Sequence, residues 1–281
     1  MTGFFILVIL LGWLFSYALN SQAILFFAVI LSFFMSFGSY WYSDKVVLAL
    51  TRAKPIAKAD NPELYRLVEN LCITAGLPLP KIYILNEAQP NAFATGRNEK
   101  NAVVVVTRGL LERLDKPELE GVIAHELSHI GNRDILLSAA VVVLVGVIAS
   151  LSNFFLRRMF FMRGSRDSEN SLGIILLVLG IAAAILAPIA ATLIQLAISR
   201  KREFLADASG ALLTRYPDGL IRALEKISAD PNPLRVASSQ TAHLYIASPF
   251  RGKETASWFT KLFMTHPPIA ERIKALREMT V

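Results

Sequence analysis

Long stretches without a charged residue constrain this 281-residue chain more than any other feature of its sequence. The first 43 residues contain no Asp, Glu, Lys or Arg, and two further uncharged runs follow at Ile135–Leu156 and Ser171–Ser199. A helix needs about 20 predominantly apolar residues to cross the hydrocarbon core of a bilayer. The runs therefore predict about four transmembrane or membrane-associated helices, the first two at about Phe4–Leu19 and Ala23–Tyr42.

Other interpretations of these runs are weaker. A cleaved signal peptide does not suit the first run, because no basic residue precedes it and its apolar character continues far beyond a signal segment. The two later runs could instead form a buried helical hairpin in a soluble core. A soluble core rarely supplies such long charge-free helices, and the mean hydropathy of +0.47 favours a bilayer. A second hairpin that crosses the bilayer and one that packs against protein both fit the sequence.

The basic residues of the chain cluster at the ends of the apolar runs, and the net charge is +7. No nucleic-acid recognition motif accompanies this charge, so we expect no nucleic-acid partner. Lys and Arg concentrate in the cytoplasmic loops of membrane proteins. Their balance along this chain predicts a cytoplasmic location for the soluble segments. The single cysteine, Cys72, cannot form an intramolecular disulfide; it falls in a predicted amphipathic helix and is expected to be a core residue.

Residues 125–129 have the sequence HELSH, an HExxH motif in a segment that predicts a helix. Residues four apart on a helix share a face, so His125 and His129 can bind one metal ion. Glu126 is placed to take a proton from a water molecule at that ion. This arrangement is typical of zinc hydrolases, which also need a third protein ligand and an open coordination position. The motif predicts one Zn²⁺ ion per chain; a non-catalytic membrane scaffold with a structural metal is the alternative.

Glu203 is the best candidate for the third ligand. It lies four residues before Asp207, so the two carboxylates share a helix face. Glu203 can bind the metal while Asp207 accepts a hydrogen bond from the outer nitrogen of a ligating histidine. His129 lies six residues before the third apolar run, and Glu203 lies four residues after the fourth, which places both near one membrane face. Asp134 is either a support for the site or a helix-end charge, and His243 is expected to be structural.

Residues 91–96 (NAFATG) predict a short extended segment. An exposed edge strand there could pair with the backbone of an extended substrate, which would tolerate many side chains. Asn91, Ala92, Phe93 and Ala94 are the candidate substrate-binding residues of this strand. An ordinary loop is the alternative.

The sequence HELSHIGNRD at 125–134, followed by EFLAD at 203–207, resembles the HtpX family of bacterial membrane zinc metalloproteases. These are relatives of the CAAX prenyl proteases in the gluzincin group. NAFATG at 91–96 and THPPIAERIKAL at 265–276 extend the likeness over nearly the whole chain. In such proteins the two histidines and the downstream glutamate bind zinc, and the glutamate of HExxH is the catalytic base. The resemblance implies the same roles for the corresponding residues here, which are His125, His129, Glu203 and Glu126.

The resemblance also implies roles for two residues near the C-terminus. Related proteases carry a histidine and an arginine at the spacing of His266 and Arg272. His266 is therefore expected to stabilise the transition state, with Arg272 beside it. Each residue has a structural alternative: His266 as a cap before two prolines, and Arg272 on a solvated helix face.

Four segments follow from these features. A transmembrane hairpin (1–43) precedes a soluble protease subdomain with the HExxH helix (44–134), and a second membrane hairpin (135–199) precedes a C-terminal protease subdomain with the third ligand (200–281). Strands are predicted at Lys81–Leu85 and Val103–Thr107, an Asp115–Glu118 capping box begins the HExxH helix, and further helices start near Arg200 and Pro268. The predicted fold is an α-helical membrane protein with an α+β zincin-like metalloprotease domain, whose small sheet lies beside the active-site helix.

The function implied by the resemblance is endoproteolysis of membrane proteins, especially damaged or misfolded ones, in membrane protein quality control and stress response. The implied location is the bacterial inner membrane, with the active site facing the cytoplasm. The expected partners are the lipid bilayer, membrane-protein or unfolded polypeptide substrates, and other membrane quality-control proteases. A CAAX-type prenyl-protein endopeptidase is the alternative, which the short chain and the lack of additional spans disfavour.

Overall fold

The computed structural model describes residues 22–143, 200–238, 241–249 and 267–279, and the isolated residues Ile9, Trp13, Ser16 and Tyr17. The chain divides into two units. The first comprises Met1–Tyr42 and Val143–Thr192, and the second comprises Ser43–Val142 and Leu193–Val281. All described residues of the predicted metal site belong to the second unit.

Helix α2 (Gln22–Thr51) contains the second of the predicted membrane spans, Ala23–Tyr42. In the part of the chain that the structure describes, no helix is both long enough and apolar enough to cross a membrane. The other predicted spans, at about residues 4–19, 135–156 and 171–199, fall wholly or largely outside the described residues.

A small mixed sheet forms the base of the second unit. Its strands among the described residues are β1 (Lys54–Pro55), β2 (Lys81–Leu85), β3 (Ala92–Gly96) and β4 (Ala102–Thr107). Their spatial order is β1-β2-β4-β3, with β2 and β4 parallel and the two outer strands antiparallel to their neighbours. Both predicted strands are confirmed, although β4 begins one residue earlier than expected. The NAFATG segment forms the edge strand β3, so the alternative of an ordinary loop is wrong.

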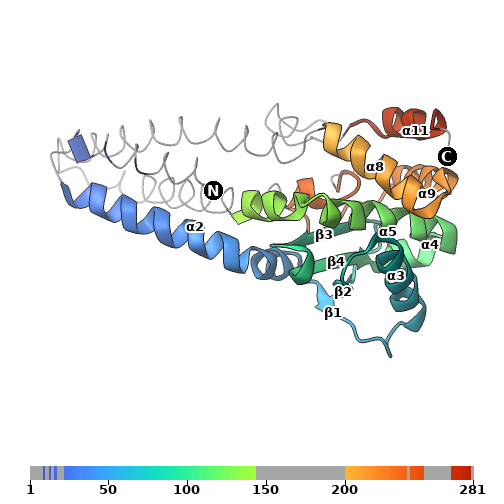
Figure 1. The fold of residues 1–281 in the computed structure, drawn as a ribbon, viewed down its shortest axis with the longest axis horizontal. Helices are drawn as coiled ribbons and strands as arrows, with labels where there is room; N and C mark the ends of the chain where they lie inside the picture. The colour runs from blue at the N-terminus through green and yellow to red at the C-terminus, as the bar shows by residue number, and fades with distance from the viewer. Residues whose placement is uncertain are drawn as a thin grey trace, which may run out of the picture. The chain divides into compact units, whose positions relative to one another are not determined.

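Helices cover this sheet and surround the HExxH motif. They are α3 (Pro62–Ala75), α4 (Arg108–Arg113), α5 (Lys116–Gly131), α8 (Arg200–Thr214), α9 (Pro217–Ala229) and α11 (Ile269–Arg277), with the short 3₁₀ turns η1 (Glu99–Asn101) and η2 (Ala242–Leu244). The HExxH helix α5 lies between the sheet and the pair α8 and α9, and α11 packs on that pair (Figure 1). The helices predicted to start near Arg200 and Pro268 are confirmed.

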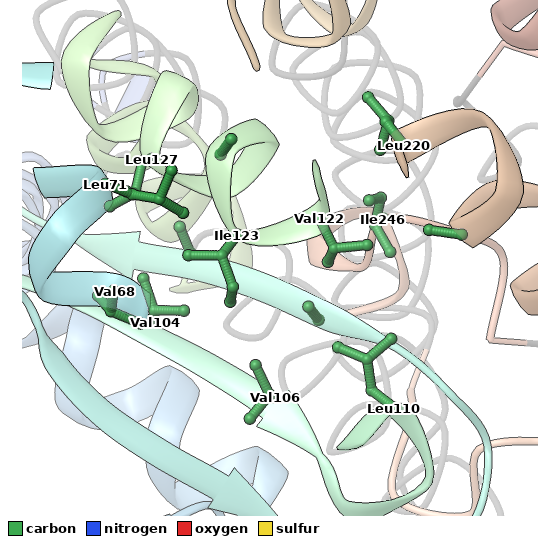
Figure 2. Packing of buried hydrophobic residues seen from close by; sticks show 14 of the residues in the cluster. Val68, Leu71, Val104, Val106, Leu110, Val122, Ile123, Leu127, Leu220 and Ile246 are labelled. Carbon is green, nitrogen blue, oxygen red and sulfur yellow. The ribbon is translucent and has the colours of Figure 1, made fainter. Parts of the chain in front are cut away.

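The main hydrophobic core forms where α5 meets the sheet and α3. Its central side chains come from these three elements and are Val68, Leu71, Val104, Val106, Ile123 and Leu127 (Figure 2). The alternate residues of β4, Val103 and Val105, face a second cluster with Phe93 and Tyr245. A strand that is buried on both faces needs apolar side chains throughout, which explains the unbroken run of valines.

A local sequence signal fixes the start of α5. The predicted capping box is confirmed: Asp115 Oδ1 accepts the N–H of Glu118 at 3.1 Å, and Glu118 Oε2 accepts the N–H of Asp115 at 2.9 Å. Lys226 in α9 donates to the same Glu118 oxygen at 2.6 Å and joins α9 to the start of α5. The helix ends at Gly131, two residues after His129. Both histidines of the motif therefore lie in its last two turns.

Gly210 allows α8 to approach α5 closely at the first histidine. A Cβ atom at this position would lie 2.9 Å from the backbone nitrogen of His125 and 3.2 Å from its Cα. Backbone atoms inside a helix cannot rotate away as the end of a side chain can. The absence of a side chain at Gly210 therefore brings Glu203 and Asp207, which lie on the same helix, up to the HExxH motif.

Gly210→Ala should destabilise the protein, because the added methyl group pushes α8 away from α5. Overpacking of this kind costs about 1–3 kcal/mol, and the displacement of Glu203 should also weaken zinc binding. Urea unfolding and a zinc titration measure the two effects. Gly131→Ala is the matched control, since its Cβ would meet only the Leu77 side chain, at 3.8 and 3.9 Å. Equal effects of the two substitutions would contradict the role given to Gly210.

Candidate metal centre

The end of α5 and the first turn of α8 bring three potential metal ligands together. The rings of His125 and His129 stand edge to face, with centroids 4.8 Å apart. Glu203 faces both rings: one carboxylate oxygen lies 3.9 Å from His125 Nε2, and the other lies 3.5 Å from His129 Nε2. One ligand atom from each residue lies within 4.8 Å of the other two.

This set of donor atoms fits zinc. Two imidazole nitrogens and one carboxylate oxygen are a common ligand set of catalytic zinc sites, which keep a fourth position for water or substrate. Ligand atoms around a tetrahedral zinc lie about 3.3 Å apart when the bonds are about 2.0–2.1 Å long. The observed separations are 3.5 and 3.9 Å to the two carboxylate oxygens, and no two of the ligand atoms lie more than 4.8 Å apart, so the side chains must close by up to about 1.5 Å to hold the ion.

Glu126 lies beside these ligands and is placed to act as a base. The residue is 2% exposed, and its carboxylate accepts a hydrogen bond from the backbone N–H of Ala94 in β3. Burial raises the pKa of Glu126 to about 7; the charge of His129 opposes this effect and that of Glu203 adds to it. A carboxyl group with this pKa can take up and release a proton near neutral pH.

Asp207 supports His125 from the side opposite to the metal. Its Oδ1 lies 2.9 Å from His125 Nδ1, so it can accept the Nδ1–H bond and leave Nε2 to face the other ligands. Burial alone would raise the pKa of Asp207, but the charge and hydrogen bonds of Arg272 and the contact with His125 lower it to about 2. Asp207 is therefore ionised at any physiological pH. The sequence predicted this contact from the spacing of Glu203 and Asp207 on one helix face.

Arg272 does not lie on the solvated helix face that was one of the two places predicted for it. Its side chain is fully buried and donates two bonds to Asp207, from Nη2 to Oδ1 at 2.6 Å and from Nε to Oδ2 at 2.8 Å. A third bond runs from Nη1 to the carbonyl of Ile246 at 2.8 Å. These short contacts make Arg272 a support for Asp207, and its predicted place beside His266 is not tested. His266 lies outside the described residues, so its predicted role stays a prediction.

Asp134 is a functional candidate that the sequence reasoning left undecided. Its Oδ2 lies 3.1 Å from His129 Nδ1, and its Oδ1 lies 3.4 Å from Nη1 of Arg202. The second histidine thus contacts a carboxylate on its outer nitrogen, as the first one does. Spacing along a regular helix could not have revealed this contact, because the chain leaves the helix between the two residues.

The metal ligands face a small, partly open cavity of about 30 Å³, which has room for little more than a water molecule or two. Its wall is formed by the end of α5 and the start of α8, by Ala94 of β3, by Ser138 after α5, and by the residues around η2, which are His243, Leu244, Tyr245 and Ile246. His243 Nε2 lies 3.2 Å from the carbonyl of Ser138, so this histidine joins the wall to the helical residues that follow α5. Tyr245 packs edge to face on Phe93, with ring centroids 5.1 Å apart. Phe93 is therefore a core residue and not an open contact for substrate.

The outer edge of β3 is covered where the strand begins. Ile246 donates its N–H to the carbonyl of Ala92 at 3.0 Å, and the Asn91 side chain donates to the carbonyl of Ala247 at 3.0 Å. Asn91 is fully buried. Asn91 therefore holds the chain around η2 against the sheet. This contact takes the place of the predicted contact with substrate. Ala94, further along β3, lines the cavity.

Comparison with known proteins identifies the family. The model of peptidase family M48 matches residues 58–280 of this chain. The chain belongs to peptidase family M48. Within M48, it is 49% identical to a protease HtpX homolog from Syntrophobacter fumaroxidans, over 90% of this chain and 88% of the relative. It is 46% identical to a protease HtpX homolog from Pyrococcus furiosus, over 94% of this chain and 90% of the relative.

A more distant likeness is to the crystal structure of S. mikatae Ste24p, with a TM-score of 0.48 and 19% identity over 98% of this chain and 67% of that one. This likeness adds nothing to the assignment. The matches to M48 and to the HtpX homologs confirm the family that the sequence motifs predict. The M48 protein is an HtpX-type zinc metalloprotease, and its metal site consists of His125, His129 and Glu203.

Zinc affinity should rise with pH up to about pH 9. Burial alone would lower the pKa of His129, but the hydrogen bond to Asp134 and the negative charges of Glu203 and Glu126 raise it to about 9 in the metal-free protein. Zinc binds only the neutral imidazole, so at lower pH it must displace a proton. We expect the affinity to increase roughly tenfold per pH unit from neutral pH and to level off above the pKa of His129. Competition with a chelator measures this, and a flat profile would contradict a protonated His129.

Proposed function

We propose that this M48 protein is an integral membrane endopeptidase that hydrolyses peptide bonds of membrane proteins, chiefly damaged or misfolded ones, as part of membrane protein quality control. One observation carries the proposal more than any other. The three metal ligands and the carboxyl group of Glu126 converge on one buried cavity beside an edge strand. Such a site has room for a hydrolytic metal and its water, and it places them beside a strand with which an extended polypeptide can pair.

The residues of the site divide the reaction between them. His125, His129 and Glu203 would hold the zinc ion, which when bound supplies a Lewis acid that polarises the scissile carbonyl and makes a water molecule more acidic. Glu126 takes the proton of the attacking water and passes it to the leaving amine. The N–H of Ala94 donates to this carboxylate and holds it in place.

The path of β3 supports a polypeptide as the substrate. Asn91, at the start of the strand, pairs with Thr107 through its carbonyl, so the alternation of an antiparallel ladder directs the backbone groups of Ala92 and Ala94 to the outer edge. Ile246 already occupies the edge at Ala92. The edge at Ala94 faces the cavity; its N–H is engaged by Glu126, so its carbonyl is the backbone group with which an extended substrate can pair, without specific side chains. Tolerance of many sequences suits an enzyme that removes damaged proteins.

The proposed membrane location is supported by the uncharged runs and by the surface of α2. Several large apolar side chains of this helix are exposed, among them Phe26 at 68%, Phe34 at 66%, and also Phe33, Phe37 and Trp41. Contiguous apolar surface of this kind is unfavourable in water and indicates contact with lipid or protein. The basic residues at the ends of the runs support an active site that faces the cytoplasm.

Glu126→Gln should lower peptide-bond cleavage by about 10²–10⁴-fold, because the amide cannot accept the proton of the attacking water. Zinc content should stay unchanged, since Glu126 is not a ligand. The assay uses the full chain in vesicles with a destabilised membrane protein as substrate and a prenylated CAAX peptide in a parallel reaction. Glu120→Gln on the same helix is the control, because its exposed carboxylate lies outside the site. Cleavage at the wild-type rate by Glu126→Gln, or cleavage of the prenylated peptide alone, would count against the proposed function.

The protein should remain in the membrane pellet when cell membranes are washed with alkaline carbonate. Peripheral proteins are released by this treatment, whereas spanning helices are held by the lipid. Protease added to the outside of spheroplasts should leave the residues of the metal site intact until the membrane is permeabilised. Release into the supernatant would contradict an integral location, and digestion in intact spheroplasts would contradict the cytoplasmic orientation.

A further inference from the structure

Asp134 reaches the second zinc-binding histidine because the chain turns sharply after α5. In a continuous helix a residue five positions after His129 would lie about 140° around the axis, away from the metal face. Here α5 ends at Gly131, and Arg133 adopts a φ of 60°, which is uncommon for a residue with a side chain. This turn reverses the direction of the next side chain. Asp134 Oδ2 consequently lies 3.1 Å from His129 Nδ1.

We propose that Asp134 is a positioning residue of the metal centre, which orients His129 through Nδ1, with Arg202 as its charge partner. A hydrogen bond to the outer nitrogen of a ligating histidine fixes the tautomer and the ring plane, so that the other nitrogen is ready for the metal. Nε2 of His129 faces Glu203 at 3.5 Å, on the side of the ring away from Asp134.

Each of the two histidines contacts a carboxylate, and each carboxylate lies beside an arginine. His125 contacts Asp207, which binds Arg272, and His129 contacts Asp134, which lies 3.4 Å from Arg202. A guanidinium beside each carboxylate limits the movement of the acceptor. The two carboxylates approach from different elements, so each ring is held independently of the other.

Arg202 connects Asp134 to the helix that carries the third zinc ligand. It directly precedes the third ligand, Glu203, in the first turn of α8. Asp134 therefore links the second ligand, His129, to the turn of α8 that carries the third ligand, Glu203. The side chain of Asp134 is only 12% exposed, compared with 36% for Arg202. A carboxylate this protected from water is poorly suited to being an ordinary helix-end charge, which is the other role that the sequence allowed.

The test compares Asp134→Ala and Asp134→Asn with a matched control, Glu99→Gln. Glu99 forms an exposed ion pair with Arg133, 3.5 Å from its Nε, so the control removes a carboxylate beside the same turn without touching a zinc ligand. Three quantities are measured on the full chain: the zinc dissociation constant by chelator competition, the visible absorption spectrum with Co²⁺ in place of zinc, and the urea stability of the metal-free protein. Peptide cleavage at saturating zinc is then separated into kcat and KM.

Asp134→Ala should weaken zinc binding by about 10–100-fold, alter the Co²⁺ spectrum and lower kcat with little change in KM. Asp134→Asn keeps an oxygen acceptor for the Nδ1–H of His129, so it should recover much of the affinity and the wild-type spectrum. Glu99→Gln should leave zinc affinity and spectrum unchanged. Metal-free stability is compared among the variants to separate a general loss of folding from a loss confined to the metal centre.

Three results would overturn the proposal. Zinc affinity and a Co²⁺ spectrum like those of the wild type in Asp134→Ala would mean that His129 does not need this contact. An equal loss of affinity in Glu99→Gln would mean that the turn, and not the carboxylate, supports the site. If Asp134→Ala lost metal-free stability and Asp134→Asn recovered stability but not zinc affinity, the role of Asp134 would be structural.

Discussion

The buried ion pair between Arg272 and Asp207 is the interaction on which the metal centre depends. Two charges removed from water are costly unless their geometry is good and their remaining hydrogen-bonding groups are satisfied. Here Arg272 donates two bonds to Asp207 and one to the carbonyl of Ile246, while Asp207 also contacts His125. The pair thereby connects α11, α8 and α5, which carry residues far apart in the sequence. Removing either partner would leave a buried charge beside a zinc ligand.

The charges around the site favour a divalent cation. The described residues near the ligands supply four carboxylates and two guanidinium groups, which are Glu126, Asp134, Glu203, Asp207, Arg202 and Arg272. Burial, with a smaller contribution from the charge of Glu203, raises the pKa of Glu126 to about 7 when no metal is present. A zinc ion would compensate this negative charge, so folding of the site and binding of the metal support each other.

The same network connects the metal centre with the edge strand. Both backbone polar groups of Ile246 are engaged: its carbonyl accepts from Arg272, and its N–H donates to the carbonyl of Ala92 at the start of β3. Asn91 holds the next residue, Ala247, to the same strand. Displacement of α11 would therefore disturb the wall of the cavity together with His125. The wall of the cavity that a substrate would reach and the position of His125 therefore depend on the same contacts.

The sequence by itself determined the elements with strong local signals: the capping box that starts α5, the two strands with apolar runs, the ligand pair His125 and His129, and Glu203 four residues before Asp207. These features depend on periodicity and spacing within one element, which the sequence displays directly. Only the tertiary structure decided the contacts of Arg272, Asn91 and Asp134. Their partners come from other elements, or lie across a turn with positive φ, and no periodic pattern encodes such contacts. An arginine on a short helix looks solvent-exposed until its buried carboxylate partner is known, and that partner lies 65 residues away.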